Sequence, residues 1–421
     1  MSIILEAIEQ KKRGGELSEE LIRSIVTGYT NGDVPDYQMA AFLMAVFIQG
    51  MSYEETLALT AAMADSGERY SFPDCVDKHS TGGIGDKISL ISLPIVAACG
   101  AWVAKLSGRG LGQTGGTVDK LEAIPGFSCN LSEERFYRQV EEIGLAIVEA
   151  GDLAPADKSI YALRDTTGTM DSLPLIGSSI VSKKAATGAG HLLYDVKCGS
   201  GAFMKTSAEA RELAGLLVRL SESLGVRASA LITGMAEPLG AAVGNALELR
   251  ESVALLKGEP VAEDLAREAR LVAARLLALK GIPDAEGAVE RAISSGAAYE
   301  KLREFVAAQG GDADALESLT VSDAVTEVAA PEGGYVAGLD ALSVGQAALA
   351  LGAGRERKTD AVDHSVGVEV MIKVGDEVEA GQTIARLYGS RRAGEAASLV
   401  RGALAVSGEK VEPPPAILDS L

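Results

Sequence analysis

The stretch "CVDKHSTGGIGDKISLISLPIVAACGAWVAKL", residues 75–106, decides the fold class of this chain. "CVD" and "AWVAKL" have the composition of strands, and the apolar "KISLISLPIVAACG" between them predicts a helix that ends at Gly100. Pro94 lies inside that helix and predicts a kink or a late start. Strand, helix and strand in this order are typical of a parallel sheet covered by helices, which is an α/β fold.

The same alternation returns later in the chain. "LLYDVKCG" and "VRASALITG" read as strands, and they flank a helix, "SAEARELAGLLVRLSESLG", that Thr206 and Glu209 can cap. Further helices are expected over about residues 241–308. From about Ala330 the composition becomes β-rich, as in "VGVEVMIKVGDEVEAGQTIARLYG". "VGDEVEAGQ" resembles the hairpin of biotinyl or lipoyl carriers, but Lys373 lacks a Met-Lys-Met context, so we expect a structural hammerhead-like module.

The first 65 or so residues predict helices. Ser18 can cap one helix, and Ser52 with Glu55 has the capping-box pattern that opens another. Between them Pro35 precedes "DYQMAAFLMAVFIQG", which is apolar nearly all round. Such a helix needs cover on all sides, so we expect it in a helical bundle or a subunit interface.

Composition bounds the class of protein. The chain has 421 residues, which predicts two or three domains. It carries 39 Lys and Arg against 59 Asp and Glu, so broad nucleic-acid binding is not expected. Its four cysteines form no CxxC pair, which is typical of reduced cysteines in a cytoplasmic protein. The N-terminus lacks a signal-peptide pattern, and no stretch approaches the ~20 apolar residues of a membrane span.

The glycine-rich loop "KHSTGGIGDKIS" predicts a small-anion site, most plausibly for phosphate. Its three glycines let backbone N–H groups turn toward one point, and the helix that follows adds its positive end. Lys78 supplies a charge, and Ser80, Thr81 and Ser89 supply hydroxyls. A plain glycine turn between strand and helix is the alternative. His79 is one of three histidines, and its place beside Lys78 favours an acid–base role near pH 7.

A second glycine loop lies in "KLSGRGLGQTGGTVDKLEAIPGF", residues 105–127, and it contains a literal G-x-G-x-x-G. A dinucleotide fold is the alternative here. We reject it because Pro125 and Gly126 follow within a few turns, and no acidic residue ends a second strand about 20 residues on. Ser107 and Thr117 flank the glycines, so the two loops could converge on one phosphate.

A third segment, "YALRDTTGTMDSLPLIGSSIVSKK", carries hydrogen-bond donors. Pro174 can start a helix in which Ser179 and Lys183, four residues apart, share a face. With Arg164 they form a donor-only set that suits a planar ligand with carbonyl oxygens, especially one that gains negative charge as it leaves. The alternative is a solvated, positively charged helix end, which fits Lys184 best.

Together these motifs resemble the thymidine/pyrimidine-nucleoside phosphorylase family. "KHSTGGIGDK", "SGRGLGQTGGTVDKLEAIPGF", "YALRDTTGTMDSLPLI" and "DVKCGSGAFM" occur in family order, and the resemblance continues to "VDHSVGVEVMIKVGDEVEAGQ". It implies a small helical domain (residues 1–65 and 160–190), a large α/β domain with a central mixed sheet (66–159 and 191–329) and a C-terminal α+β module (330–421). The active site would lie in the cleft between the first two domains.

The resemblance also implies a reaction and its residues. Members split pyrimidine nucleosides with inorganic phosphate as co-substrate and no organic cofactor, with inversion at C1, in cytoplasmic nucleoside salvage. Members are homodimers that associate through the helical domain. Phosphate would contact Lys78, Ser80, Ser89, Lys105, Ser107 and Thr117; the pyrimidine would contact His79, Arg164, Ser179 and Lys183, and His79, Arg164 and Lys183 would be catalytic.

Two departures from the family pattern stand out. Some bacterial relatives bind potassium or another cation near the glycine loop, at positions that match Gly85, Lys87, Leu239, Ala242 and Glu251. Lys87 replaces the small hydroxyl residue expected there, and its ammonium could take the place of the cation. Gln113 stands where relatives usually carry His in "GLGHTGGT", and glutamine cannot titrate.

Three other functions stay open. The first is narrow thymidine specificity, because the pocket for the 2′-OH is not legible in the sequence. The second is a phosphoribosyltransferase of the same fold, which would lack the intact Lys-His-Ser-Thr run. The third is a non-catalytic binder of nucleoside or phosphate, which the presence of His79, Arg164 and Lys183 together disfavours.

Overall fold

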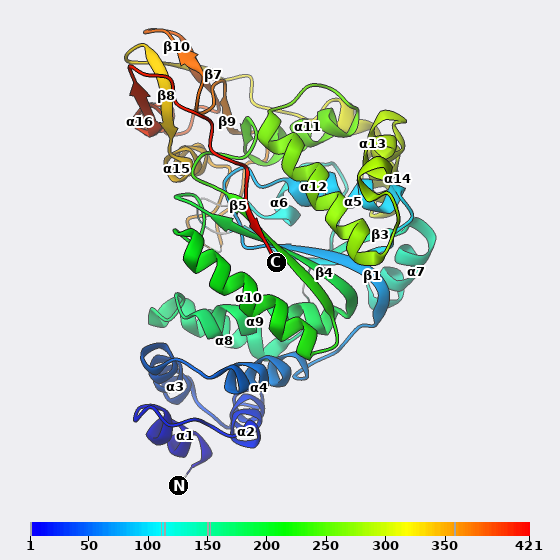
Figure 1. The fold of residues 1–421 in the computed structure, drawn as a ribbon, viewed down its shortest axis with the longest axis vertical. Helices are drawn as coiled ribbons and strands as arrows, with labels where there is room; N and C mark the ends of the chain where they lie inside the picture. Colours follow the sequence, from blue (N-terminus) through cyan, green and yellow to red (C-terminus); the bar gives the residue numbers. More distant parts are fainter. Residues whose placement is uncertain (1, 111, 113–114, 150, 152, 358) are drawn as a thin grey trace. The chain divides into compact units, whose positions relative to one another are not determined.

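The computed structural model describes all residues except 1, 111, 113–114, 150, 152 and 358 (Figure 1). The chain divides into two compact units. The helical unit contains Met1–Cys75, Ala150–His191 and Gly215–Ala228, and the α/β unit contains Val76–Glu149, Leu192–Ala214 and Ser229–Leu421. The helical unit therefore takes in residues 215–228, in addition to the two segments that the sequence predicts for it.

Six helices build most of the helical unit. They are α1 (Ile3–Lys11), α2 (Glu19–Thr30), α3 (Asp36–Gln49), α4 (Tyr53–Ala64), α8 (Pro155–Thr167) and α9 (Leu173–Thr187). Their core is apolar and includes Ile22, Met39, Phe42 and Leu59. The predicted caps are confirmed, because Ser18 accepts a hydrogen bond from the backbone N–H of Leu21, and α4 has its capping box.

The apolar helix α3 is covered on one side only. Met39, Phe42 and Val46 are buried, but Tyr37 is 74% exposed and Ile48 is 70% exposed. α3 therefore lies in a helical bundle, one of the two places expected for it, and the single chain does not test the other, a subunit interface. The sequence could not show which apolar positions face the core, because α3 is apolar nearly all round.

The α/β unit is built on a mixed six-stranded sheet with the order β13-β5-β4-β1-β2-β3. β1 pairs with β2 and β2 with β3 in parallel, whereas β13 is antiparallel to β5. The strands are β1 (Phe72–Ser80), β2 (Val103–Ser107), β3 (Leu145–Glu149), β4 (Ala189–Cys198), β5 (Arg227–Gly234) and β13 (Ile417–Ser420). The parallel α/β pattern predicted from residues 75–106 is confirmed, and β1 is longer than "CVD" because it continues through Ser80.

Helix α5 (Ile88–Ala98) forms the centre of this unit. Every residue from Ile88 to Ala97 is buried, and the helix contacts α12 and α14. It runs through Pro94 without a late start, so the predicted helix is confirmed. The other helices are α6 (Thr117–Leu121), α7 (Glu133–Ile143), α10 (Ser207–Ser223), α11 (Asn245–Leu256), α12 (Glu263–Lys280), α13 (Ala285–Ser294), α14 (Ala297–Ala308) and the 3₁₀ turn η1 (Ala313–Glu317).

The C-terminal segment forms two small sheets and two helices, and it exchanges strands with the rest of the unit. The sheets are β10-β8-β12 and β6-β9-β11-β7. β6 (Ala242–Val243) comes from the α/β part of the sequence, and the last strand β13 returns to the large sheet beside β5 (Figure 1). The remaining elements are β7 (Val325–Ala329), β8 (Gly334–Leu339), α15 (Ala341–Leu351), β9 (Gly367–Val370), β10 (Glu377–Val378), β11 (Thr383–Tyr388), α16 (Ala393–Ala403) and β12 (Leu404–Ser407).

Lys373 is held in place within this segment. Its ammonium lies 2.7 Å from Asp264 and donates to the carbonyl of Pro238 at 2.6 Å. A lysine held by a carboxylate and a carbonyl does not serve as a swinging carrier arm. This agrees with the structural role that we expected from the sequence.

Candidate active site

The Lys-His-Ser run lies at the end of β1, and the glycine loop connects it to α5. Ser80 donates a hydrogen bond to Asp86 and accepts one from the N–H of Gly82 at 3.1 Å. Asp86 also accepts the N–H of Ile88 at 3.2 Å, so it caps the start of α5. The loop is therefore folded around Asp86, a residue whose role was not predicted from the sequence.

Lys78 is buried at the end of β1, between two carboxylates. Its Nζ lies 2.7 Å from Asp195 Oδ2 and 3.8 Å from Asp86 Oδ1, and the side chain is 0% exposed. Lys105 of β2 donates to the backbone carbonyl of Lys78, and its Nζ lies 3.5 Å from Asp77. The two predicted phosphate-binding lysines are therefore in contact, and buried carboxylates neutralise their charge.

The charge network continues behind Lys78. Lys197 lies 3.0 Å from Asp195 and also pairs with Glu268 of α12. Burial opposes the ionisation of Asp86 and Asp195, but Lys197 and Lys78 outweigh it and lower the pKa of both. Burial raises the pKa of Glu268 to about 8, against the attraction of Lys197. Asp195 and Lys197 lie in the "DVKCGSGAFM" motif and Glu268 lies in no motif, and all three follow Lys78 by more than a hundred residues, so no short-range pattern indicated that they would meet behind it.

The second glycine loop follows β2, with Ser107 at the end of the strand and Thr117 as the first residue of α6. α6 has five residues, so the glycines do not open the long helix of a dinucleotide fold. Asp119 accepts the N–H of Gly110 at 2.6 Å and pairs with Arg355 of the C-terminal segment at 2.8 Å. The position of Gln113 lies outside the described residues.

The two glycine loops line one small cavity of the α/β unit. Its volume is about 20 Å³, which suits a single water molecule. It is lined by Gly85 of the first loop, Gly112 and Gly115 of the second, and the start of α11. The structure therefore brings together the two loops that the sequence singled out separately.

His79 neighbours Tyr194 of the adjacent strand β4. The two rings meet edge to face, with centroids 6.1 Å apart and planes at 72°. This packing fixes the position of the imidazole at the end of β1, next to Lys78.

Arg164 of α8 is almost fully buried, and its guanidinium turns inward. It donates to the backbone carbonyls of Thr169, Leu175 and Met170 at 3.2, 3.0 and 2.9 Å. Burial lowers its pKa. In this structure Arg164 braces the turn between α8 and α9, a structural task that the sequence did not reveal.

Ser179 and Lys183 share a face of α9, as the spacing predicts. Lys183 Nζ lies 3.3 Å from Ser179 Oγ and 2.8 Å from Asp157 of α8. The ammonium also lies 5.5 Å from the centroid of the Tyr161 ring. Asp157 is buried and Lys183 is 30% exposed. Asp157 of α8 therefore holds the ammonium while part of the lysine side chain is exposed to solvent.

The predicted phosphate set lies within one unit, whereas the predicted pyrimidine set, which includes His79, is divided between the two. The described phosphate-side residues and His79 belong to the α/β unit, and Arg164, Ser179 and Lys183 belong to the helical unit.

The five positions that match a family cation site do come together. Lys87 Nζ donates to the carbonyl oxygens of Leu239 at 2.8 Å and Ala242 at 2.9 Å, and to Glu251 at 2.6 Å. Gly85 packs beside them, because a Cβ there would lie 2.6 Å from the Leu239 oxygen. The ammonium fills the position of a cation, so these residues do not fit a metal ion. Among the described residues no group of three or more His, Cys, Asp or Glu side chains could hold a metal.

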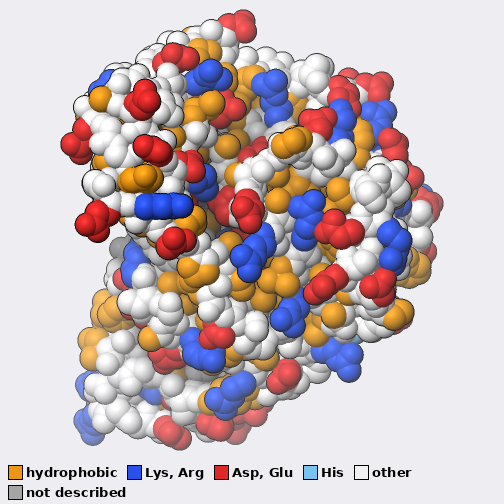
Figure 2. Space-filling model, turned by 45° about the horizontal axis from the view of Figure 1, so that its top comes forward, with side chains coloured by type: hydrophobic (Ala, Val, Ile, Leu, Met, Phe, Trp, Pro, Cys, Tyr) orange, Lys and Arg blue, Asp and Glu red, His pale blue; other side chains and the backbone are white. Residues whose placement is uncertain are grey.

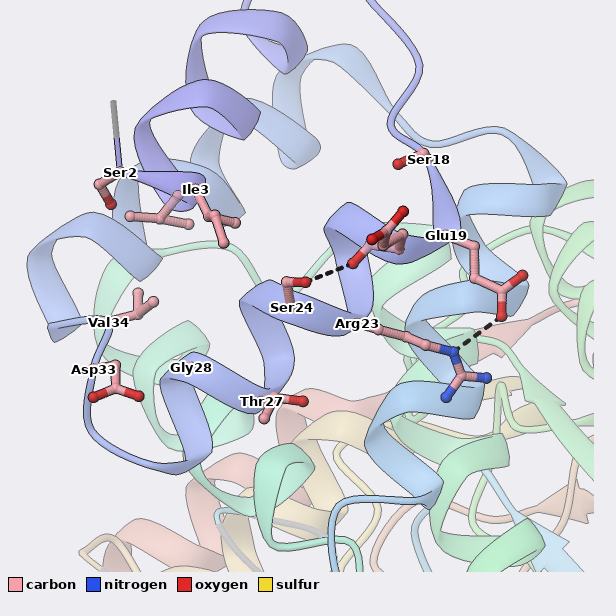
Figure 3. A pocket seen from close by; sticks show the side chains of 12 residues that line it. Ser2, Ile3, Ser18, Glu19, Arg23, Ser24, Thr27, Gly28, Asp33 and Val34 are labelled. Atoms are coloured by element: carbon pink, nitrogen blue, oxygen red, sulfur yellow. Dashed lines mark hydrogen bonds and ion pairs between the residues drawn. The ribbon is translucent and has the colours of Figure 1, made fainter.

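The helical unit also has a larger cavity, away from the predicted site residues. A cavity of about 900 Å³ in the helical unit lies along α1 and α2, and it contains none of the predicted site residues (Figure 3). Arg23, the one cation among the described residues that line it, pairs with Glu19 and Asp65, so it is not free to bind an anion. On the face shown in Figure 2 basic and acidic side chains are interspersed. No helix of the described chain has the length and hydropathy needed to cross a membrane.

Three family models together cover most of the chain. Residues 5–67 match the helical bundle domain of a glycosyl transferase family, and residues 72–299 match the α/β domain of the same family. Residues 335–407 match the pyrimidine nucleoside phosphorylase C-terminal domain.

Relatives that align over most of the chain belong to the same family as the C-terminal match. The pyrimidine-nucleoside phosphorylase of Staphylococcus epidermidis is 44% identical over 91% of this chain and 92% of its own. This chain belongs to the pyrimidine-nucleoside phosphorylase family. The member from Bacillus subtilis is 43% identical over 92% of both chains, and the thymidine phosphorylase of Mycobacterium tuberculosis is 55% identical over 60% of both. Membership makes the chain an enzyme of the pentosyltransferase class.

A solved structure shares the fold. The anthranilate phosphoribosyltransferase of Thermus thermophilus aligns with a TM-score of 0.59 over 72% of this chain and 99% of its own, at 22% identity. At this identity the likeness concerns the fold alone.

Proposed function

We propose that this enzyme splits pyrimidine nucleosides, namely uridine, thymidine and deoxyuridine, by phosphorolysis. A phosphate oxygen attacks C1 of the sugar from the face opposite the base, and the C1–N1 bond breaks with its electron pair leaving on the base. The products are the free base and (deoxy)ribose 1-phosphate, with inversion at C1. The observation that carries the proposal is the 44% identity to a pyrimidine-nucleoside phosphorylase over 91% of the chain, with the family motifs present in order apart from the departures at Lys87 and Gln113.

Phosphate is proposed to bind at the ends of β1 and β2. Lys78, Ser80 and Ser89 would hold it from the first loop; Lys105, Ser107 and Thr117 would hold it from the second. The pairing of β1 with β2 supports this assignment, because it brings Lys105 to the backbone carbonyl of Lys78. Asp195 already neutralises Lys78, so phosphate would join a charge network that is in place before it arrives.

The base is proposed to bind in the helical unit. Ser179 and Lys183 share a face of α9, and Lys183 can donate to a pyrimidine oxygen that becomes anionic as the bond breaks. Arg164 would contribute one of the N–H groups that its three carbonyl contacts leave unused. His79 would donate to the base from the phosphate side. The proposal requires that the two units bring both sets to one substrate and exclude water from it.

One experiment tests the reaction and its substrate range. The protein is incubated with uridine, thymidine and cytidine, with and without phosphate, and release of free base is followed by chromatography. We expect phosphate-dependent release from uridine and thymidine and none from cytidine. Release from thymidine alone would establish the narrower specificity of the relative from M. tuberculosis. Release without phosphate would indicate a hydrolase, and no release from any nucleoside would contradict the proposal.

We also propose a homodimer in the cytoplasm. The exposed Tyr37 and Ile48 on α3 support association through the helical unit, because large apolar side chains that stay exposed in one chain often mark an interface. The four cysteines are free, which suits a reducing compartment. Light scattering after size exclusion would give twice the chain mass, and a monomer mass would contradict the dimer.

A further inference from the structure

Lys87 occupies a place built for a cation. It precedes the first residue of α5, directly after the glycine loop, and its side chain is 0% exposed. An ammonium has three N–H donors, and all three are used, on two backbone carbonyls and one carboxylate. This arrangement leaves no donor for water or ligand.

The surroundings fit closely around the ammonium. Gly240 has φ +72°, and a Cβ there would lie 2.9 Å from Lys87 Nζ and 2.8 Å from the Glu251 oxygens. A Cβ on Gly85 would lie 2.6 Å from the Leu239 oxygen. Glycines at both positions let two backbone segments pack closely around the Lys87 ammonium. No space is left beside it, so a metal ion would have to displace the ammonium.

Glu251 is already bound by three donors. It accepts the backbone N–H of Ala241 at 2.8 Å and of Ala242 at 3.0 Å, in addition to the ammonium. Its charge is balanced by Lys87 alone, and another positive charge a few ångströms from a buried ammonium would be strongly repelled.

The contacts of Lys87 connect segments far apart in the sequence. They tie the start of α5 to residues 239–242 and to α11, over separations of 152 to 164 residues. Lys373 binds the same segment from the C-terminal side, through the carbonyls of Pro238 and Gly240. Ser80 at the end of β1 and Ser89 in the first turn of α5 stand on either side of Lys87, so this anchor fixes the connection between them.

We propose that the Lys87 ammonium is an internal replacement for a monovalent cation, so that the glycine loop of this protein is fixed without any bound ion. Lys87 is a positioning residue, since it contacts only protein groups. The proposal does not depend on the activity proposed above, because the measurements below record ion binding and stability.

The test compares the wild type with two variants. Lys87→Thr removes the ammonium and supplies a hydroxyl beside the vacated carbonyls and carboxylate. Lys87→Met removes the same charge but fills the space with an apolar chain. Each protein is melted in potassium, rubidium, sodium and tetramethylammonium chloride at equal ionic strength, and bound rubidium is measured by equilibrium dialysis.

We expect the wild type to bind no rubidium and to melt at one temperature in all four salts. Lys87→Thr should melt lower in tetramethylammonium and about 4 °C or more higher when potassium or rubidium is present, with one rubidium bound per chain. Lys87→Met should melt lower in every salt and bind none. One rubidium bound to the wild type would overturn the proposal, and this measurement decides the matter even if neither variant folds. A folded Lys87→Thr with no ion preference would overturn it too.

Discussion

Two lysines of the proposed site, Lys78 and Lys183, are held in opposite ways. Lys78 is 0% exposed, between the carboxylates of Asp195 and Asp86. Lys183 is 30% exposed and has one carboxylate partner, Asp157, with Ser179 beside it. The charge on the phosphate side belongs to the interior of the protein, whereas the charge on the base side lies partly in solvent. Changes at Lys78 should therefore affect both folding and catalysis, and changes at Lys183 should affect mainly binding.

The largest effect is expected from Lys78→Met. It removes the phosphate-side charge and leaves Asp195 and Asp86 short of a partner, so the free energy of unfolding should fall by about 3–5 kcal/mol. Phosphorolysis of uridine should fall at least about 10²-fold in kcat/KM for phosphate, as for other lost charge-stabilising groups. Urea unfolding and steady-state rates measure the two losses.

The double variant Lys78→Met/Asp195→Asn separates the two losses. It removes the carboxylate that has lost Lys78 and leaves Lys197 with Glu268 as its partner, so it should recover part of the stability and none of the activity. Recovered activity would show that Lys78 serves the fold alone and would remove the contrast between the two lysines.

The sequence predicted the local parts of this contrast well. Ser179 and Lys183 are four residues apart on one helix, and Ser80, Ser89 and the glycines act within a dozen residues, so short-range periodicity and spacing were enough. The partners were not predictable, because Asp195 and Glu268 approach Lys78 and Lys197 only through the order of strands and helices in the α/β unit. Arg164 shows the same limit, since its carbonyl partners depend on the exact path of the turn between α8 and α9.

The next effect concerns His79, which stands beside Lys78 but carries out a different step. His79→Ala should lower kcat by about 10²-fold or more, because it removes the proposed proton donor to the leaving base. Binding of phosphate, measured by calorimetry, should stay unchanged. His191→Gln is the matched control, since His191 lies outside the motif and should leave both quantities as they are. Normal turnover in His79→Ala would exclude the general-acid role.

Lys183→Ala should act mainly on the base. The KM for uridine should rise about tenfold, the scale of one lost charged hydrogen bond of about 1.5 kcal/mol, with the KM for phosphate unchanged. Asp157 is buried, so the single variant should also lose some stability. Lys183→Ala/Asp157→Asn removes the unpaired carboxylate and should recover that stability while the KM for uridine stays high. An unchanged KM in both variants would place base recognition elsewhere.

The smallest effect concerns the charge network behind Lys78, through the pH dependence of stability. Burial raises the pKa of Glu268 from the ordinary 4.5 to about 8, so between these values the native protein holds a proton that the unfolded chain has released. Stability should therefore fall as pH rises through this window. The lowered pKa values of Asp86 and Asp195 add stability with rising pH only near and below their ordinary pKa, so they do not mask the trend.

Glu268→Gln removes this titration and keeps the shape of the side chain. The advantage of the wild type over the variant in free energy of unfolding should be larger near pH 5 than near pH 8, as measured by urea unfolding. Contributions from groups that are the same in both proteins cancel in the difference. Parallel curves would mean that Lys197 keeps Glu268 ionised throughout, and that the buried network around Lys78 holds one more negative charge than proposed. Phosphate would then meet a weaker positive field at the end of β1, and the rate loss in Lys78→Met should be correspondingly smaller.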